Sequence, residues 1–180
     1  MNGAEVSVRR VGATEAATRA DALAQALADL LIDCVEGGAS VGFMVPLAPE
    51  RALTFWRGVI DGVARGERLL LLAEDCDGRV VGTVQLVTAQ ADNQPHRADV
   101  AKMLVHRSAR RRGIAQRLMV ALDSAARAAG KTVLVLDTVT GGDAERLYQR
   151  AGWQRVGVVS NYALMPTGEF CATTFFFKQV

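Results

Sequence analysis

The stretch SARRRGIAQRLM, residues 108–119, places Arg110, Arg111 and Arg112 directly before Gly113 and an apolar, helix-forming run. The amino end of a helix already carries partial positive charge and unpaired N–H groups, so extra cations there are unfavourable unless an anion binds. A glycine lets the backbone approach a ligand closely, and arginines donate charge-assisted hydrogen bonds to phosphate oxygens. The spacing therefore predicts a phosphate-binding turn at the start of a helix.

This turn differs from the common nucleotide-binding motifs. It lacks the Lys-Ser/Thr pair of a Walker A loop and the G-x-G-x-x-G spacing of a dinucleotide fingerprint. Nucleic-acid binding through Arg107–Arg112 is an alternative, and it would give steeply salt-dependent affinity. The formal net charge of only +2 and the absence of base-stacking aromatics argue against a nucleic-acid partner.

Two carboxylates flank the same region of the sequence. Asp99 begins the strand expected at residues 98–105, and Asp137 ends the strand expected at 131–138. The helix expected from Gly113 to the residue before Gly130 joins these strands, so the three elements form a βαβ unit with two parallel strands. Asp99 and Asp137 are the two carboxylates that the sequence places nearest the expected reaction centre, where desolvation of the pair would raise one pKa and make that carboxylate a better base.

The remaining elements surround this unit. Helices are expected from Thr14, as a cap, to Gly37, from Pro49 to Gly66 with Trp56 in its apolar stripe, and at residues 144–152 with Asp143 as cap. Strands are expected at residues 5–11, 68–74, 79–87, 153–159 and 172–180, the second and third as an antiparallel hairpin. The pattern predicts an α/β (α+β) fold: a mixed, mostly antiparallel sheet with one central parallel pair and flanking helices.

Length and composition limit the class of protein. The 180 residues suffice for one domain, 1–180, and half of them are hydrophobic while 22% are charged, which excludes a disordered chain. The amino terminus lacks a signal-peptide core, and no apolar run approaches the roughly 20 residues that cross a bilayer, so we expect a soluble, cytoplasmic protein without a membrane partner. The odd, scattered cysteines predict neither a metal site nor disulfides, and we interpret them as buried small residues: Cys34, Cys76 and Cys171.

Two motifs carry a resemblance to a known family. Residues 110–115, RRRGIA, resemble the Q/R-x-x-G-x-G/A signature of the GNAT superfamily of acyl-CoA-dependent N-acyltransferases, and LYQRAGW resembles its A-x-x-L-Y-x-x-x-G-F/W segment. The order of elements matches over nearly the whole chain. Within the superfamily the chain is most similar to tabtoxin-resistance acetyltransferases, through GGASVGFM, RADVAKMLV, SARRRGIAQRLM and LDT. One departure is Gly141, where many relatives have an asparagine seven residues before the tyrosine.

The resemblance implies a GNAT fold and a site for acetyl-CoA as cosubstrate, without metal. The backbone of Met103, Leu104 and Val105 would pair with the pantetheine arm, and the N–H groups from Arg111 to Ala115 would hold the pyrophosphate. The complete set of implied cofactor-binding residues is Met103, Leu104, Val105, Arg110, Arg111, Arg112, Gly113, Ile114, Ala115 and Tyr148.

The expected reaction is transfer of an acetyl group to the amino group of a small molecule such as a β-lactam amino-acid toxin or antibiotic. Amines are mostly protonated at neutral pH, so we expect Asp99 to accept a proton, directly or through water, and Asp137 to orient the ammonium, with both in contact with the substrate. A share of the base role for Asp137 stays open, and the sequence does not decide which of the two is the proton acceptor. An N–H near Leu104 would polarise the thioester, and Tyr148 would protonate the departing thiolate. By position alone, Phe43, Met44 and the expected Tyr162 loop complete the acceptor pocket.

Several alternatives stay open at this stage. The acceptor could be a protein N-terminus or a lysine, and the chain could be a CoA-binding regulatory module without turnover. The apolar strand at the carboxyl end could pair across a homodimer or lie inside the sheet.

Overall fold

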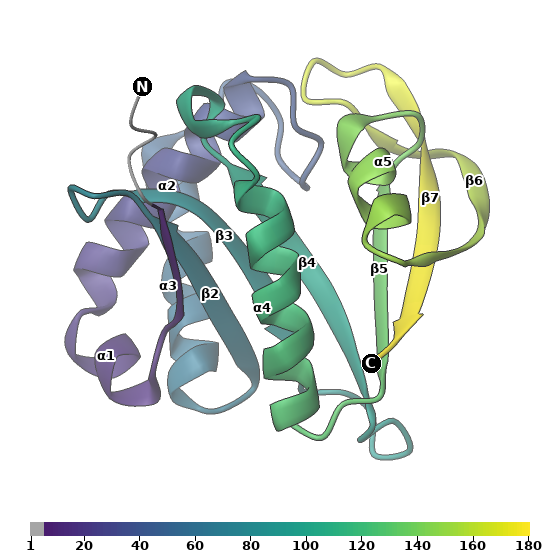
Figure 1. Ribbon diagram of the computed structural model, residues 1–180. Coiled ribbons are helices and arrows are strands. Elements are labelled where there is room, and N and C mark those ends of the chain that lie inside the picture. Colours follow the sequence, from purple (N-terminus) through teal and green to yellow (C-terminus); the bar gives the residue numbers. More distant parts are fainter. Residues whose placement is uncertain (1–5) are drawn as a thin grey trace.

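The computed structural model describes residues 6–180 (Figure 1). The first five residues of the expected domain lie outside the described residues, and they include Glu5, where the first strand was expected to begin. The strands are β1 (Ser7–Arg10), β2 (Arg68–Glu74), β3 (Val80–Val87), β4 (Arg97–Val105), β5 (Val133–Val139), β6 (Gln154–Leu164) and β7 (Phe170–Gln179). The helices are α1 (Ala13–Thr18), α2 (Ala20–Glu36), α3 (Pro49–Ala64), the 3₁₀ turn η1 (Arg107–Ala109), α4 (Ile114–Ala128) and α5 (Asp143–Arg150).

The seven described strands form one sheet in the order β1-β2-β3-β4-β5-β7-β6. Every neighbouring pair is antiparallel except β4 and β5, which are parallel. This arrangement confirms the predicted mixed sheet and its central βαβ unit. Because β7 lies between β5 and β6, it has no free edge through which to pair with a second copy, and β6 is the edge strand instead.

Helices cover both faces of the sheet and enclose two apolar cores. On one face α1, α2 and α3 pack around Trp56, which is 0% exposed as its apolar stripe predicts. On the other face α4 and α5 pack over a core that includes Phe176 and Leu118. Figure 1 shows α4 in front of the sheet and α2 and α3 behind it.

Local signals fixed some helix ends and misplaced others. Pro49 is the first residue of α3, as predicted. Thr14 is not a cap: the first helix starts after Gly12 and breaks at Arg19, so that α1 and α2 are separate. Asp143 is likewise not the cap of α5 but its first residue, where its charge favours the helix dipole.

Three further expectations on the strands and cysteines are corrected. Tyr162 lies inside β6, because that strand extends to Leu164 and the loop comes after it. Residues of β5 alternate between more and less buried positions, so the strand is not fully covered on both faces as its continuous apolar run suggested. Cys76 is exposed because it occupies the turn between β2 and β3.

The parallel pair β4 and β5 is joined for only part of its length. Pairing covers Arg97–Asp99 against Val133–Val135 and then stops, while β5 remains paired with β7 to its end. Figure 1 shows the two strands separating toward their carboxyl ends. The second half of β4 is therefore paired with β3 alone, which leaves the backbone edge of β4 free on its β5 side.

Gly82 of β3 allows α4 to lie close to the sheet. A Cβ added there would meet the Leu104 carbonyl oxygen, Ile114 Cγ2 and Leu118 Cδ1, each at 3.2 Å. We therefore expect Gly82→Ala to lower the free energy of unfolding by about 1–3 kcal/mol, as overpacking typically does. Urea unfolding measures this loss.

Gly58 provides the control, because it is an exposed helical glycine of α3 with no atom near the added Cβ. Gly58→Ala should raise stability by about 0.5–1 kcal/mol through helix propensity. Equal or higher stability for Gly82→Ala would show that α4 does not press on β3.

Candidate active site

The predicted phosphate-binding turn precedes α4. Gly113 is the N-cap of the helix with a φ of 75°, and Arg111 has a φ of 62°, so two left-handed residues shape the turn. The first described helical bond runs from the Arg117 N–H to the Gly113 carbonyl at 3.1 Å, so the N–H groups of residues 114–116 precede the helical ladder. Neither a side-chain cap nor an acidic residue compensates the first turn. The turn thus keeps the features of an anion-binding helix start.

The arginines of this turn do not all serve the same purpose. The Arg110 Nε donates to the Val105 carbonyl at 3.2 Å, which ties the turn back to the end of β4. The side chains of Arg110 and Arg111 help lower the pKa of the Asp143 carboxyl, after the larger effect of its Arg146 partner. This electrostatic effect indicates that the start of α5 lies close to the turn. All three arginines are exposed, where they can reach a ligand.

The free edge of β4 presents a specific set of backbone groups. The His106 N–H donates to the Val81 carbonyl at 2.9 Å, and the Leu104 carbonyl lies against Gly82, so both residues face β3. Since backbone groups alternate in direction along a strand, those of Val105, between Leu104 and His106, face the gap toward β5, where the Val105 carbonyl accepts from Arg110 Nε and from Cys34 Sγ. Met103 lies in the bulge of β4, where this alternation is interrupted. Leu104, near which the sequence predicts an N–H that polarises a bound carbonyl, directs its own backbone to β3 and its side chain into the core.

Asp137 lies on the opposite side of the gap, on β5. Its pKa is raised above the usual range of aspartate, first by burial, although Lys102 opposes the shift and Asp99 adds to it. The residue still has access to solvent. A solvent-accessible carboxylate with a raised pKa can reach a ligand and is a better proton acceptor than an ordinary aspartate.

Asp99 shares the sheet face of Asp137 because it pairs with Val135, two residues before Asp137 on β5. Its two oxygens are already bonded: Arg97 Nη1 donates to Oδ1 at 2.7 Å and Gln90 Nε2 donates to Oδ2 at 3.0 Å. Of the two aspartates, Asp99 is therefore the one paired with an arginine, which makes it the weaker candidate for a base.

Tyr148 of α5 is only 5% exposed and packs against Trp153 and Phe176, with ring centroids 5.9 and 6.2 Å away. Burial, aided by the charge of Asp137, raises the pKa of its phenol well above the usual value. The phenol therefore holds its proton firmly. The effect of the Asp137 charge on this pKa indicates that the tyrosine lies near the gap between β4 and β5.

The loop between α2 and α3 lies over the sheet face that carries Asp99 and Asp137. The Val45 N–H donates to the Pro166 carbonyl at 3.1 Å, and the Ser40 hydroxyl to the Leu164 carbonyl at 3.0 Å, so the loop is fastened to the β6–β7 turn. Phe43 stacks edge-on against Phe55 of α3 at 5.3 Å. The loop thus holds one predicted acceptor residue over the sheet face that carries both aspartates.

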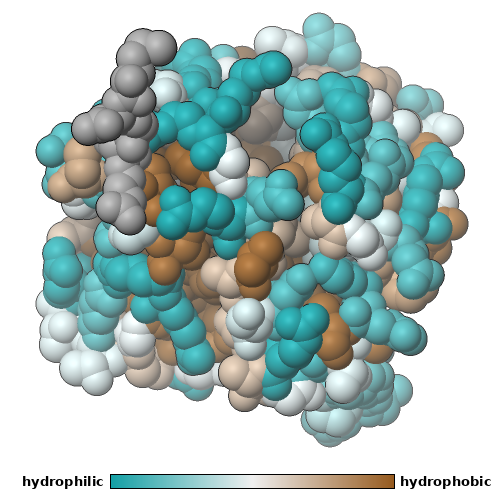
Figure 2. Space-filling view, viewed as in Figure 1, coloured by the Kyte–Doolittle hydropathy of each residue, from teal (hydrophilic) through white to brown (hydrophobic). Residues whose placement is uncertain are grey.

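The other two predicted acceptor residues are more exposed. Met44 is 39% exposed, and Tyr162 of β6 is 51% exposed with its ring 5.4 Å from that of Phe175. Phe175 pairs with Asp137 in the sheet, so Tyr162 lies over the strand next to the candidate base. In Figure 2 the surface is hollowed between the amino end of α4 and α5.

Lys102 of β4 is a site residue that sequence reasoning missed. It has a φ of 52° at a register shift, where Lys102 and Met103 face the single residue Val84 of β3. Such a β-bulge re-aims side chains. The Lys102 ammonium lies 5.4 Å from the Phe55 ring and is electrostatically coupled to Asp137. The alternation of strand residues gave no signal for this position, because the bulge breaks it.

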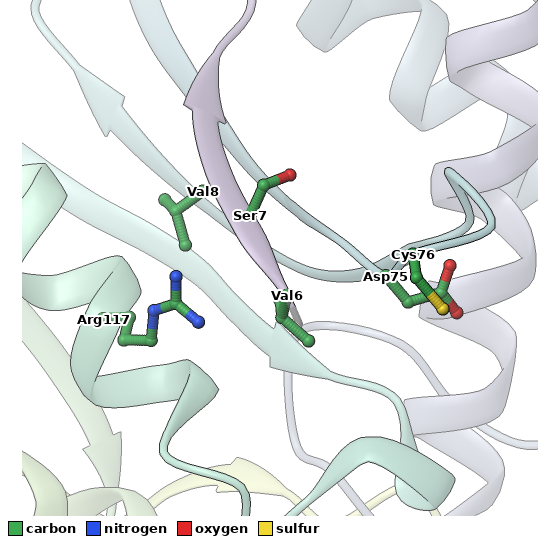
Figure 3. A pocket seen from close by; sticks show the side chains of 6 residues that line it. All are labelled: Val6, Ser7, Val8, Asp75, Cys76 and Arg117. Atoms are coloured by element: carbon green, nitrogen blue, oxygen red, sulfur yellow. The ribbon is translucent and has the colours of Figure 1, made fainter. Parts of the chain in front are cut away.

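Other features of the surface lie away from this region. Figure 3 shows a shallow pocket between β1, the β2–β3 turn and Arg117 of α4, which contains none of the predicted site residues. Among residues 6–180, no group of three or more His, Cys, Asp and Glu side chains could hold a metal ion. Within the same range, no helix has the length and apolar character to span a bilayer.

The chain is similar in sequence to known proteins. Residues 65–155 match the acetyltransferase (GNAT) domain, a range that includes the turn before α4, both aspartates and Tyr148. A curated relative from Azospirillum brasilense, an uncharacterized N-acetyltransferase in the hisH-hisA intergenic region, is 37% identical over 113 residues. That alignment covers 62% of this chain and 65% of the relative, slightly less than two thirds of the relative's length.

Solved structures share the fold. The yncA protein of Salmonella typhimurium, solved with its cofactor acetyl-CoA, is 18% identical with a TM-score of 0.75, over 97% of this chain and 94% of that chain. A ribosomal-protein-alanine N-acetyltransferase from Brucella melitensis is 20% identical with a TM-score of 0.74, over 97% of this chain and 99% of that chain. At these identities the likeness concerns the fold alone.

Proposed function

This chain belongs to the GNAT acetyltransferase family, and from that premise we propose that it transfers the acetyl group of acetyl-CoA to the amino group of a small molecule. The observation that carries the proposal is the gap between β4 and β5, with the uncapped start of α4 at one end and Asp137 on its wall. An extended acyl-pantetheine arm fits beside the free edge of β4, and its phosphates fit the turn at residues 110–115.

Acetyl-CoA, when bound, supplies an acetyl thioester that an amine can attack. On the free edge of β4 the Val105 N–H is the strand group offered to the arm, because the Val105 carbonyl accepts from Arg110 Nε and Leu104 faces β3. The Met103 backbone, in the bulge, is the second group that the resemblance implies. The N–H groups from Arg111 to Ala115, with the arginine side chains, would hold the phosphates. This set matches what the sequence resemblance implied, apart from Leu104.

We assign the proton acceptor to Asp137 rather than Asp99. An amino group must lose a proton before it attacks, and Asp137 combines access to solvent with a raised pKa, whereas both oxygens of Asp99 are engaged. Asp99 would hold the Arg97 and Gln90 side chains in place beside the acceptor. Asp99 is therefore a positioning residue. The sequence favoured Asp99 as the proton acceptor and left a share of that role to Asp137.

Tyr148 is better suited to donate a hydrogen bond than a proton. A thiol has a pKa of about 8.5, so transfer from a phenol whose pKa lies far higher is unfavourable. We expect Tyr148→Phe to lower kcat by about 2- to 10-fold, the effect of one neutral hydrogen bond. Initial rates of thiol release at saturating substrates measure this, and a loss above about 100-fold would restore the role of general acid.

A small acceptor accords with the surroundings of Asp137. The loop at residues 37–48 is fastened over the sheet, and the cations Lys102 and Arg51 lie beside the aromatic rings of Phe55 and Phe43. A protein lysine or N-terminus would call for an open, acidic groove. A toxin or antibiotic amino acid as acceptor, and a cytoplasmic location, are proposals that rest on the sequence.

The direct test is release of free thiol from acetyl-CoA in the presence of a panel of small amines, together with acetyl-CoA binding by titration calorimetry. Binding with amine-dependent release supports the proposal. Binding without release from small amines or peptides would indicate a regulatory module, and turnover of peptides alone would indicate a protein acceptor.

A further inference from the structure

Lys102 holds a positive charge that no described partner neutralises at close range. The residue is half-buried, and its ammonium makes no hydrogen bond or ion pair with any of residues 6–180. It lies 5.4 Å from the centroid of the Phe55 ring, and a Cβ on Gly42 would be 4.0 Å from it. Desolvation lowers the pKa of the Lys102 ammonium, as expected for a cation withdrawn from water. A buried charge of this kind normally has a partner of opposite sign.

The backbone conformation of β4 determines where the Lys102 side chain lies. Lys102 adopts a left-handed φ of 52°, which non-glycine residues rarely do, at the bulge between Ala101 and Leu104. Strained backbone of this sort is concentrated at functional sites. The bulge directs the lysine under the loop that carries Gly42 and Phe43, on the face of α3.

The charges around Lys102 define what a ligand must carry. Asp137 attracts the ammonium but does not form an ion pair with it, so the two charges stand apart. The Arg51 guanidinium lies 5.7 Å from the centroid of the Phe43 ring, and Asp99 forms an ion pair with Arg97. A ligand between these groups meets one carboxylate at Asp137 and an unpaired cation at Lys102.

We propose that Lys102 binds a carboxylate of the acceptor, so that the acceptor is an amino acid or another amine bearing a carboxylate. This inference rests on the proposed transfer to an amine at Asp137. The amine lies at Asp137, the carboxylate accepts hydrogen bonds from the Lys102 ammonium, and the rings of Phe43 and Phe55 contact the apolar part of the molecule. Lys102 is thus a specificity-determining residue.

The test compares amino acids with matched amines. Each of the common amino acids is assayed beside its decarboxylated amine and its α-carboxamide, by thiol release from acetyl-CoA. For the wild-type chain we expect kcat/KM to favour the carboxylate form by about 10- to 100-fold, the effect of a hydrogen bond to a charged group. Lys102→Met, similar in length but uncharged, should remove this preference, so that the kcat/KM values of the amino acid, its amine and its amide differ from one another by less than about threefold.

The comparison of matched acceptors separates recognition from an effect on Asp137. Loss of Lys102 also raises the pKa of the Asp137 carboxyl, but that change acts on all acceptors equally. Lys102→Arg retains the charge and should retain most of the preference. Thermal unfolding and acetyl-CoA binding, measured on both variants, establish that they are folded.

The outcomes are distinguishable. A wild-type preference that Lys102→Met abolishes and Lys102→Arg keeps supports the inference. Equal turnover of amines and amino acids, or equal losses for both classes in Lys102→Met, overturns it while the proposed transfer stands. Release from no member of any class overturns the small-amine acceptor, and this inference with it.

Discussion

Replacement of Asp137 by asparagine is expected to lower kcat/KM for the amine acceptor by about 10²- to 10⁴-fold, the usual contribution of a positioned general base. Asparagine keeps the shape of the side chain but cannot accept the proton. The same change should leave the dissociation constant of acetyl-CoA within about twofold, because Asp137 lies on β5 and the phosphate turn precedes α4. Thiol release and titration calorimetry measure the two quantities.

Asp99→Asn is the matched control, since both aspartates share one face of the sheet. Asp99 is bonded to Arg97 and Gln90, so its loss should cost less than about tenfold through repositioning alone. A larger loss for Asp99→Asn than for Asp137→Asn would return the base to Asp99. Unchanged turnover in Asp137→Asn would remove the base assignment altogether.

The pH profile gives an independent readout of Asp137. Its raised pKa means that the carboxyl takes up a proton as pH falls through a range above that of an ordinary aspartate. A protonated base is inactive, so kcat/KM should decline on the acid side in that range and recover as pH rises. Since Lys102 lowers the pKa of Asp137, Lys102→Met should move the acid limb to higher pH. An acid limb at the pKa of an ordinary aspartate would contradict the assignment.

Charge reversal in the phosphate turn is the second large effect. Arg111→Glu should raise KM for acetyl-CoA by about 10- to 100-fold, because one charge-assisted hydrogen bond is lost and a like charge faces the phosphates. The side chain is exposed and its backbone already adopts a φ of 62°, so folding should be little affected. With saturating acetyl-CoA, kcat should stay near the wild-type value, since the contact acts equally in ground and transition states.

Arg117→Glu makes the same change of charge on α4 but in the shallow pocket beside β1 (Figure 3). It should raise KM for acetyl-CoA clearly less than Arg111→Glu does at 0.15 M salt, because the Arg117 side chain lines this pocket and salt weakens its remaining effect on the phosphates. Equal effects of the two substitutions would mean that net charge, and not the turn, binds the cosubstrate.

The sequence by itself determined the βαβ unit, the glycine turn that begins α4 and the strands that carry the two aspartates. These features are local: periodic apolar residues, Gly113 at a helix start and a strand ending in Asp137 are all readable within a few residues. The parallel pairing of β4 with β5 and the helix start at Pro49 followed from such signals and are confirmed.

Only the tertiary structure decided which chemistry each residue can perform. Asp99 is paired because Arg97 and Gln90, on a strand and a loop, converge on it, and Tyr148 keeps its proton because Trp153 and Phe176 bury it. The interior position of β7 depends on its pairing with β5. The placement of Lys102 depends on the bulge of β4 opposite Val84. Hydrogen bonding, burial and register depend on how side chains and strands pack in the fold, even for residues close in sequence, so residue spacing alone does not determine them.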